Sequence, residues 1–111
     1  MTRMWCVPPG ILCRQHLLGE HKELHQLVGH IHAEHTNAVR GHAAKGQIDT
    51  SRIAERHDEL VDELQRRGYN HASPLEYEDT LDLGEIDESD NIEDLTERCA
   101  TCRERSLDMD D

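Results

Sequence analysis

The sequence has few aromatic side chains and no long apolar run. Its 111 residues include one tryptophan, two tyrosines and no phenylalanine, and 35% are hydrophobic. A chain of this length and composition forms one small domain with a modest core, which excludes an enzyme with a large substrate cleft. No apolar run approaches the roughly 20 residues of a membrane span, and the start MTRMWCVPPG lacks the apolar stretch of a signal peptide. We therefore expect a soluble, cytoplasmic protein that does not associate with membranes.

A secretion signal is missing, but cysteines are present. The four cysteines are Cys6, Cys13, Cys99 and Cys102. Without a secretion signal, reduced thiols are expected rather than a disulfide framework, and buried thiols that pack as small apolar groups are the simplest interpretation. The alternative is a four-thiolate zinc site in which the Cys99-x-x-Cys102 pair joins Cys6 and Cys13, although the spacing of the first pair is long for a zinc knuckle.

Positive charge is scarce in the last third of the chain. Residues 1–73 hold nine basic and nine acidic side chains, whereas residues 74–111 hold three and fifteen, so the whole net charge of −12 lies in the second part. This division predicts a helical domain over residues 1–75 and an acidic tail over residues 76–111. Ten arginines, two lysines and an excess of acid would suit a protein working in high salt, but a simple acidic tail explains them equally well.

Hydrophobic periodicity predicts two main helices. Pro9-Gly10 marks the end of an extended N-terminal arm, and a first helix is predicted to follow over about residues 11–35. A second helix follows the cap cluster Asp49-Thr50-Ser51 and stops at Gly68. Residues 36–47 are expected to form a loop with at most a short helix.

The acidic tail has room for a third helix. Asn91 could cap a helix over residues 91–105, on which Ile92, Leu95 and the last two cysteines share a face. The rest of the tail is expected to be partly disordered because it is acidic and poor in apolar residues. The predicted fold class is therefore a small, compact all-α bundle of two main helices, with room for a third and with an extended N-terminal arm.

Charged side chains lie on the apolar side of the first helix. At 100° per residue, Glu20 falls inside the apolar stripe, and Glu23 falls on its edge beside His16. A carboxylate on a buried side must be paired, or its pKa must rise. Because Glu20 lies deep in the stripe, we predict that it is a structural carboxylate paired with an arginine or with backbone N–H groups. His16 is either a boundary histidine or a residue on the substrate side.

Two stretches of the chain resemble a known family. The run from Thr2 to Gly29, with MTR, QHL and GEHKEL, resembles the start of phage-type endonuclease V, the pyrimidine dimer DNA glycosylases. The run RHDELVDELQRRGYNHASPL, residues 56–75, looks like the second helix and turn of that family. The resemblance implies a compact all-α monomer that removes a damaged base from double-stranded DNA and breaks the strand at the abasic site, with no cofactor and no required metal.

The resemblance also implies the site residues. By position, the nucleophile is the α-amine of Thr2 after removal of Met1, and the catalytic carboxylate is Glu23. The positions that touch DNA or line the site are Arg3, Gln15, His16 and Lys22. A basic residue is expected where Gln26 stands, and the aromatic and lysine-rich C-terminal segment of the family has no counterpart in the acidic tail.

The chemistry of these residue types agrees with that assignment. An α-amine has a reference pKa of about 7.7, so part of it is neutral and nucleophilic near neutral pH. Attack on the sugar would release the base and leave an imine between the protein and the DNA. Glu23 could stabilise cationic character at the sugar and then act as the base that starts elimination of the 3′ phosphate.

Two alternatives remain open at this stage. His21, His25 and His32 share one face of the first helix, and the i, i+4 pair is a spacing that zinc can bridge, but a solvated histidine-rich face is the simpler interpretation. The second alternative concerns function as a whole. A non-enzymatic DNA-, metal- or protein-binding protein could keep the same helical scaffold, and the missing basic segment at the C-terminus favours it.

Overall fold

The computed structural model describes residues 3–69 and 75–109, and in this part of the chain it has helices and no strand. The all-α class predicted from the sequence is therefore confirmed. Five α-helices and two short 3-10 helices follow one another as η1 (Pro9–Ile11), α1 (Arg14–His32), α2 (Thr36–Ala44), η2 (Thr50–Arg52), α3 (Ile53–Arg66), α4 (Glu88–Arg98) and α5 (Ala100–Met109). None of the helices in the described ranges is both long enough and apolar enough to span a membrane.

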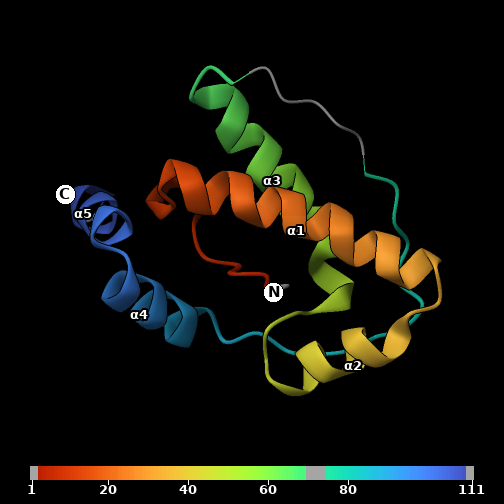
Figure 1. Cartoon of the computed structure of the whole chain (residues 1–111). Helices are drawn as coiled ribbons and strands as arrows, with labels where there is room; N and C mark the ends of the chain where they lie inside the picture. The colour runs from red at the N-terminus through yellow and green to blue at the C-terminus, as the bar shows by residue number, and fades with distance from the viewer. Residues whose placement is uncertain (1–2, 70–74, 110–111) are drawn as a thin grey trace.

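The two main helices, α1 and α3, pack against each other and form the centre of the molecule (Figure 1). Leucines at helical spacing on both elements face the contact, and each is at most 1% exposed. These leucines are Leu17, Leu24 and Leu27 of α1, and Leu60 and Leu64 of α3. The apolar stripes predicted from the sequence therefore form the core.

A buried ion pair joins α1 to α3 and to the N-terminal arm. Arg56 donates to both carboxylate oxygens of Glu20, from Nε at 2.5 Å and from Nη2 at 3.0 Å. The Nη1 atom of Arg56 also donates to the backbone carbonyl of Val7 at 2.6 Å. Because a buried charge is costly unless it is paired and hydrogen-bonded, this geometry accounts for a carboxylate inside the apolar stripe. The prediction that Glu20 is a structural carboxylate paired with an arginine is confirmed.

The N-terminal arm is extended, as predicted, and its side chains belong to the core. Met4 and Val7 are each 1% exposed, and the backbone N–H of Met4 donates to the carbonyl of Gln47 at 2.7 Å. At the far end of α3, Arg67 donates to the carbonyl of Leu12 at 2.7 Å. The arm is thus fixed on one side by the loop after α2 and on the other by the end of α3.

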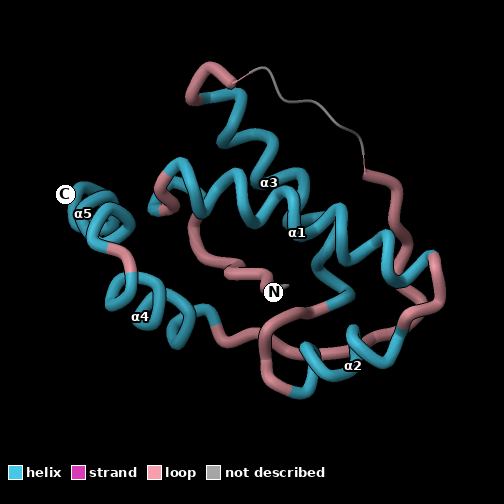
Figure 2. Tube along the Cα trace, viewed as in Figure 1, coloured by secondary structure: helices cyan, strands magenta, loops and turns pink. Residues whose placement is uncertain are grey.

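The described residues that precede α4, from residue 75 onward, run past α2 and η2 (Figure 2). The backbone N–H of Thr50 donates to the carbonyl of Leu83 at 2.9 Å, and the N–H of Leu83 donates to the Thr50 hydroxyl at 2.8 Å. Gly84 has a φ of +84°, and a Cβ at this position would lie 2.0 Å from the carbonyl oxygen of Ile48. Only glycine fits this approach, because any side chain would collide with the backbone of the neighbouring loop.

The C-terminal part differs from its prediction. Instead of one helix over residues 91–105, the chain forms α4 and α5, which are separated at Cys99 in an extended conformation. Asn91 does not cap α4, because the Asp87 side chain accepts from the N–H of Asp90 at 3.0 Å and caps it one turn earlier. Asn91 is instead buried and donates to the Trp5 carbonyl at 2.7 Å. These contacts attach the acidic helix to the arm.

Candidate functional site

Glu23 lies on α1 where the N-terminal arm crosses the helix. The backbone N–H of Arg3 donates to Glu23 Oε2 at 3.1 Å, and the Glu23 side chain is half-buried. Burial raises the pKa of the Glu23 carboxyl, and the hydrogen bond from Arg3 partly opposes that rise. At the helix edge predicted for Glu23, the backbone of Arg3 thus meets the carboxylate.

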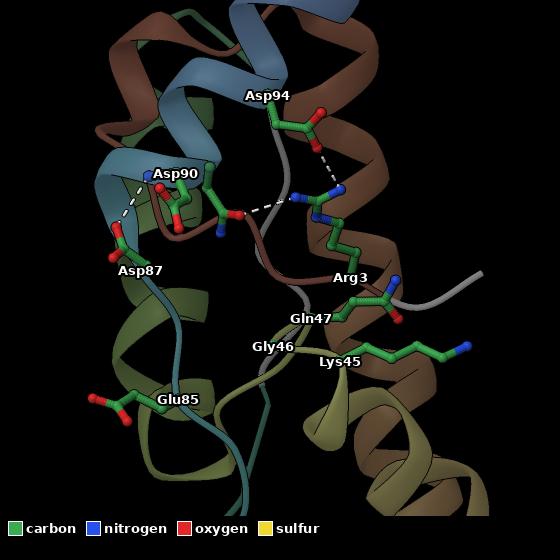
Figure 3. Close-up of a pocket in the computed structure, with 9 residues that line it drawn as sticks. Arg3, Lys45, Gly46, Gln47, Glu85, Asp87, Asp90 and Asp94 are labelled. Atoms are coloured by element: carbon green, nitrogen blue, oxygen red, sulfur yellow. Dashed lines mark hydrogen bonds and ion pairs between the residues drawn. The ribbon is translucent and has the colours of Figure 1, made fainter.

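The Arg3 side chain points toward Asp94 of α4 (Figure 3). Its guanidinium forms an ion pair with Asp94 at 2.8 Å and donates to the side-chain oxygen of Asn91 at 2.9 Å. The guanidinium carbon lies 3.9 Å from the centre of the Trp5 ring, which is a cation–π contact. The positive charge of Arg3 is therefore already compensated within the chain, and no pattern in the sequence pairs residue 3 with residues 91–94.

A cavity of about 360 Å³ lies between the arm, the loop after α2 and the start of α4. Arg3 and Lys45 are its two basic lining residues (Figure 3). Its acidic lining residues are Glu85, Asp87, Asp90 and Asp94. Because this cavity carries an excess of negative charge, it does not suit a phosphate group, and we place the candidate site at Glu23 rather than in the cavity.

The other predicted DNA-binding residues occupy different surroundings. Gln15 and Lys22 are exposed on α1, and seven residues of separation put them on one face of the helix, adjacent to the face of Glu23. Among the described residues, neither side chain has an ion pair or hydrogen bond with α4 like those that hold Arg3. Thr2, the predicted nucleophile, lies outside the described residues.

His16 lies among three cysteines. Its Nδ1 atom is 3.1 Å from Cys13 Sγ and 3.5 Å from Cys102 Sγ. Cys99 Sγ is 3.9 Å from Cys13 Sγ, and all four ligand atoms lie within 4.8 Å of one another. We call this group the thiol–histidine cluster; its members are Cys13, His16, Cys99 and Cys102. It brings the start of α1 together with the junction of α4 and α5.

Two other cysteine and histidine predictions are corrected by the structure. Cys6 is not part of the thiol–histidine cluster, because it lies near Glu20 and Arg56, where burial raises the pKa of its thiol to about 12. His21 and His25 meet His57 of α3 rather than His32, with ring centres 4.8 to 5.0 Å apart. In both cases the missing partner comes from tertiary packing, which spacing along a single helix does not reveal.

Comparison with known proteins places most of this architecture in one family. A family model for pyrimidine dimer DNA glycosylases matches residues 1–77. The match includes the arm, α1, α2 and α3, with the buried ion pair and Glu23, and ends before α4. No curated protein and no solved structure matches the chain.

Proposed function

The chain belongs to the pyrimidine dimer DNA glycosylase family, and from this premise we propose that it excises a damaged base from double-stranded DNA and cleaves the strand at the resulting abasic site. The observation that carries the proposal is the hydrogen bond from the Arg3 backbone N–H to Glu23. It holds Arg3, the residue that follows the proposed nucleophile in the chain, beside a half-buried carboxylate.

The proposed nucleophile is the α-amine of Thr2 after removal of Met1. Covalent geometry keeps the nitrogen of residue 2 within about 4 Å of the Arg3 nitrogen, whatever its conformation. Because the Arg3 nitrogen is 3.1 Å from Glu23 Oε2, the amine and the carboxylate can both reach one sugar. A neutral amine is a competent nucleophile, and its reference pKa of about 7.7 leaves part of it neutral at pH 7.

The proposed reaction proceeds through an imine. The amine nitrogen attacks the anomeric carbon of the sugar, and the bond to the damaged base breaks with its electron pair leaving on the base. One amine proton passes to the released base, and the other passes to the ring oxygen when the ring C–O bond opens, which gives the imine. Glu23 removes a proton from the adjacent sugar carbon, and the electron pair of that C–H bond expels the 3′ phosphate. Before this step, the carboxylate stabilises the cationic sugar.

The exposed face of α1 that carries Gln15 and Lys22 suits a DNA-binding role. Lys22 and Gln15 are exposed beside Glu23, where an ammonium and an amide can contact phosphate oxygens without losing a partner inside the protein. Arg3 is different, since it would have to leave Asp94 to reach a phosphate. We propose that Lys22 and Gln15 position the backbone and that Arg3 contributes only when α4 releases it.

A non-enzymatic binding protein on the same scaffold is the second candidate. The observation that favours it is the acidic lining around Arg3, which would repel a phosphate approaching from that side. Under this alternative, the chain would bind a basic partner and would form no covalent intermediate with DNA.

Borohydride trapping separates the two candidates. Protein made without an N-terminal tag, and confirmed by intact mass to begin at Thr2, is mixed with an oligonucleotide that carries an abasic site or a pyrimidine dimer. Reduction of the imine should give a stable covalent adduct of protein and oligonucleotide. No adduct with either substrate would reject the enzyme, whereas an adduct on the abasic site alone would keep the lyase and reject the dimer glycosylase.

Variants then assign the roles. Glu23→Gln preserves shape and should lower strand cleavage on the order of a hundredfold or more, while the trapped adduct still forms. Glu55→Gln on α3 is the matched control, because it removes one exposed carboxylate and should leave cleavage unchanged. Retained Met1 or an acetylated Thr2 in fully active protein would reject the amine nucleophile.

A further inference from the structure

The thiol–histidine cluster has the composition of a structural metal site. Three sulfur donors and one imidazole nitrogen make a Cys₃His set, one of the common sets for structural zinc. It is built from two pairs with the same spacing, Cys13-x-x-His16 at the start of α1 and Cys99-x-x-Cys102 at the junction of α4 and α5. We infer that this cluster binds one zinc ion, which fastens the acidic helices to the domain.

The distances agree with tetrahedral zinc. Bonds of about 2.3 Å to sulfur and about 2.0 Å to nitrogen place two sulfurs about 3.8 Å apart and a sulfur and a nitrogen about 3.5 Å apart. The Cys13 and Cys99 sulfurs are 3.9 Å apart, and His16 Nδ1 is 3.1 and 3.5 Å from two sulfurs. An ion at the centre would therefore need only small shifts of the side chains.

Backbone N–H groups already point at the sulfurs. The N–H of Cys13 donates to Cys102 Sγ at 3.2 Å, and the N–H of Cys102 donates to Cys99 Sγ at 3.5 Å. Such donors stabilise negative charge on thiolate ligands and fix their direction, so they form the outer layer that metal sites require. Packing of apolar thiols alone needs no such donors.

The histidine also distinguishes this site from plain thiol burial. His16 and Cys99 are only partly buried, so an ion can enter from solvent, whereas Cys13 and Cys102 close the inner side. Binding would replace the three thiol protons, which pass to solvent. The ion would link Cys13 to Cys99, which are 86 residues apart. This link lowers the conformational entropy of the unfolded chain and so stabilises the fold. The family resemblance implies no required metal. We infer here a zinc ion that stabilises the structure, and the proposed reaction still requires no metal.

The first measurement is the metal content of untagged protein purified without chelator. We expect one zinc per chain by mass spectrometry under native conditions and by elemental analysis. Replacement of zinc by cobalt should give the sulfur-to-cobalt charge-transfer absorption and the intense visible bands of a tetrahedral site. This readout identifies thiolate ligands in the unaltered protein, so it stands even where a variant fails to fold.

Variants locate the ion. Cys102→Ser should lose the zinc and the charge-transfer band, while Cys6→Ala and His57→Gln should keep both, because Cys6 lies outside the cluster and His57 belongs to the separate histidine group. Chelator should lower the melting temperature of the unaltered protein and should not lower that of Cys102→Ser. The inference is overturned by protein without zinc, by cobalt bound without sulfur absorption, by zinc lost on His57→Gln with Cys102→Ser unaffected, or by a mass lower by two hydrogens, which indicates a disulfide.

Discussion

The family-matched part of the chain and its acidic C-terminal part are held in place by different chemistry. In the first, α1 and α3 meet through leucines and one fully buried ion pair between Glu20 and Arg56. In the second, α4 and α5 place few apolar side chains in the core, chiefly Leu95 and Cys102, and depend on Asn91 and on groups at the start of the chain.

This difference shows how a short domain can carry an acidic appendage. Residues 1–77 hold nine basic and ten acidic side chains and are nearly neutral, whereas α4 is acidic and forms an ion pair with Arg3 of the arm. The appendage is thus attached at the start of the chain, close to the candidate site. From this position we expect it to weaken DNA binding without a direct part in the proposed chemistry.

The largest expected effect is the loss of the buried pair. Glu20→Gln removes the only buried carboxylate that pairs with the Arg56 guanidinium among the described residues, which should lower the free energy of unfolding by about 3–5 kcal/mol. Glu59→Gln is the control, because Glu59 lies 3.4 Å from the same guanidinium and is 40% exposed, so its loss should cost less than about 1 kcal/mol. Urea unfolding monitored by circular dichroism compares them, and equal costs would show that the first part does not depend on the pair.

The second prediction tests whether the acidic part shares the core. Leu95 is 0% exposed, so Leu95→Ala should lower the free energy of unfolding by about 2–5 kcal/mol through lost burial and a cavity. Leu107 of α5 is 63% exposed, and Leu107→Ala should change stability by no more than about 0.5 kcal/mol. If thermal or urea unfolding finds the two variants alike, α4 is an independent appendage and the comparison drawn above fails.

The third prediction is a loss of cleavage activity at low pH, which arises from groups in the family-matched part of the chain alone. Burial raises the pKa of Glu23 above its ordinary value near 4.5, and the carboxylate form is the one that accepts a proton. As pH falls through that raised pKa, the base is lost, and the amine, with a reference pKa of about 7.7, is protonated as well. Below both values, single-turnover cleavage of an abasic-site oligonucleotide should fall about a hundredfold per pH unit.

The control for this pH profile is Glu23→Gln, which should be slower throughout and fall only about tenfold per pH unit, because the amine alone remains to titrate. If the cleavage rate of the unaltered protein also fell only about tenfold per pH unit, Glu23 would not be the base.

Sequence reasoning predicted the local features and missed the long-range contacts. The position of Glu20 in an apolar stripe required a partner such as an arginine, and Arg56 fills that role. Helix periodicity could not show that Cys13 and Cys99 meet across 86 residues, nor that His16 joins them where the alternative zinc site had Cys6. The i, i+3 spacing of Cys13 and His16 was the available signal, because it places both side chains on one face of the first turn of α1.

The smallest expected effect concerns charge on α4. Glu93 and Glu97 are exposed on the helix that holds Arg3, so Glu93→Gln with Glu97→Gln should tighten binding to an abasic-site duplex a few fold at low salt, by roughly 1 kcal/mol or less. At 1 M salt, screening limits such repulsion to about 3 Å, and the difference should vanish.

The matched control for the α4 pair, Glu93→Gln with Glu97→Gln, is Glu55→Gln with Asp62→Asn. It removes the same two negative charges from the exposed side of α3. Fluorescence anisotropy of a labelled duplex at both salt concentrations compares the two pairs. Tightening by the α4 pair alone would locate the repulsion at the helix that faces Arg3. Equal tightening by both pairs would instead assign it to net charge, because two removed charges would then act alike wherever they lie, and the acidic helix would have no special relation to the DNA-binding surface.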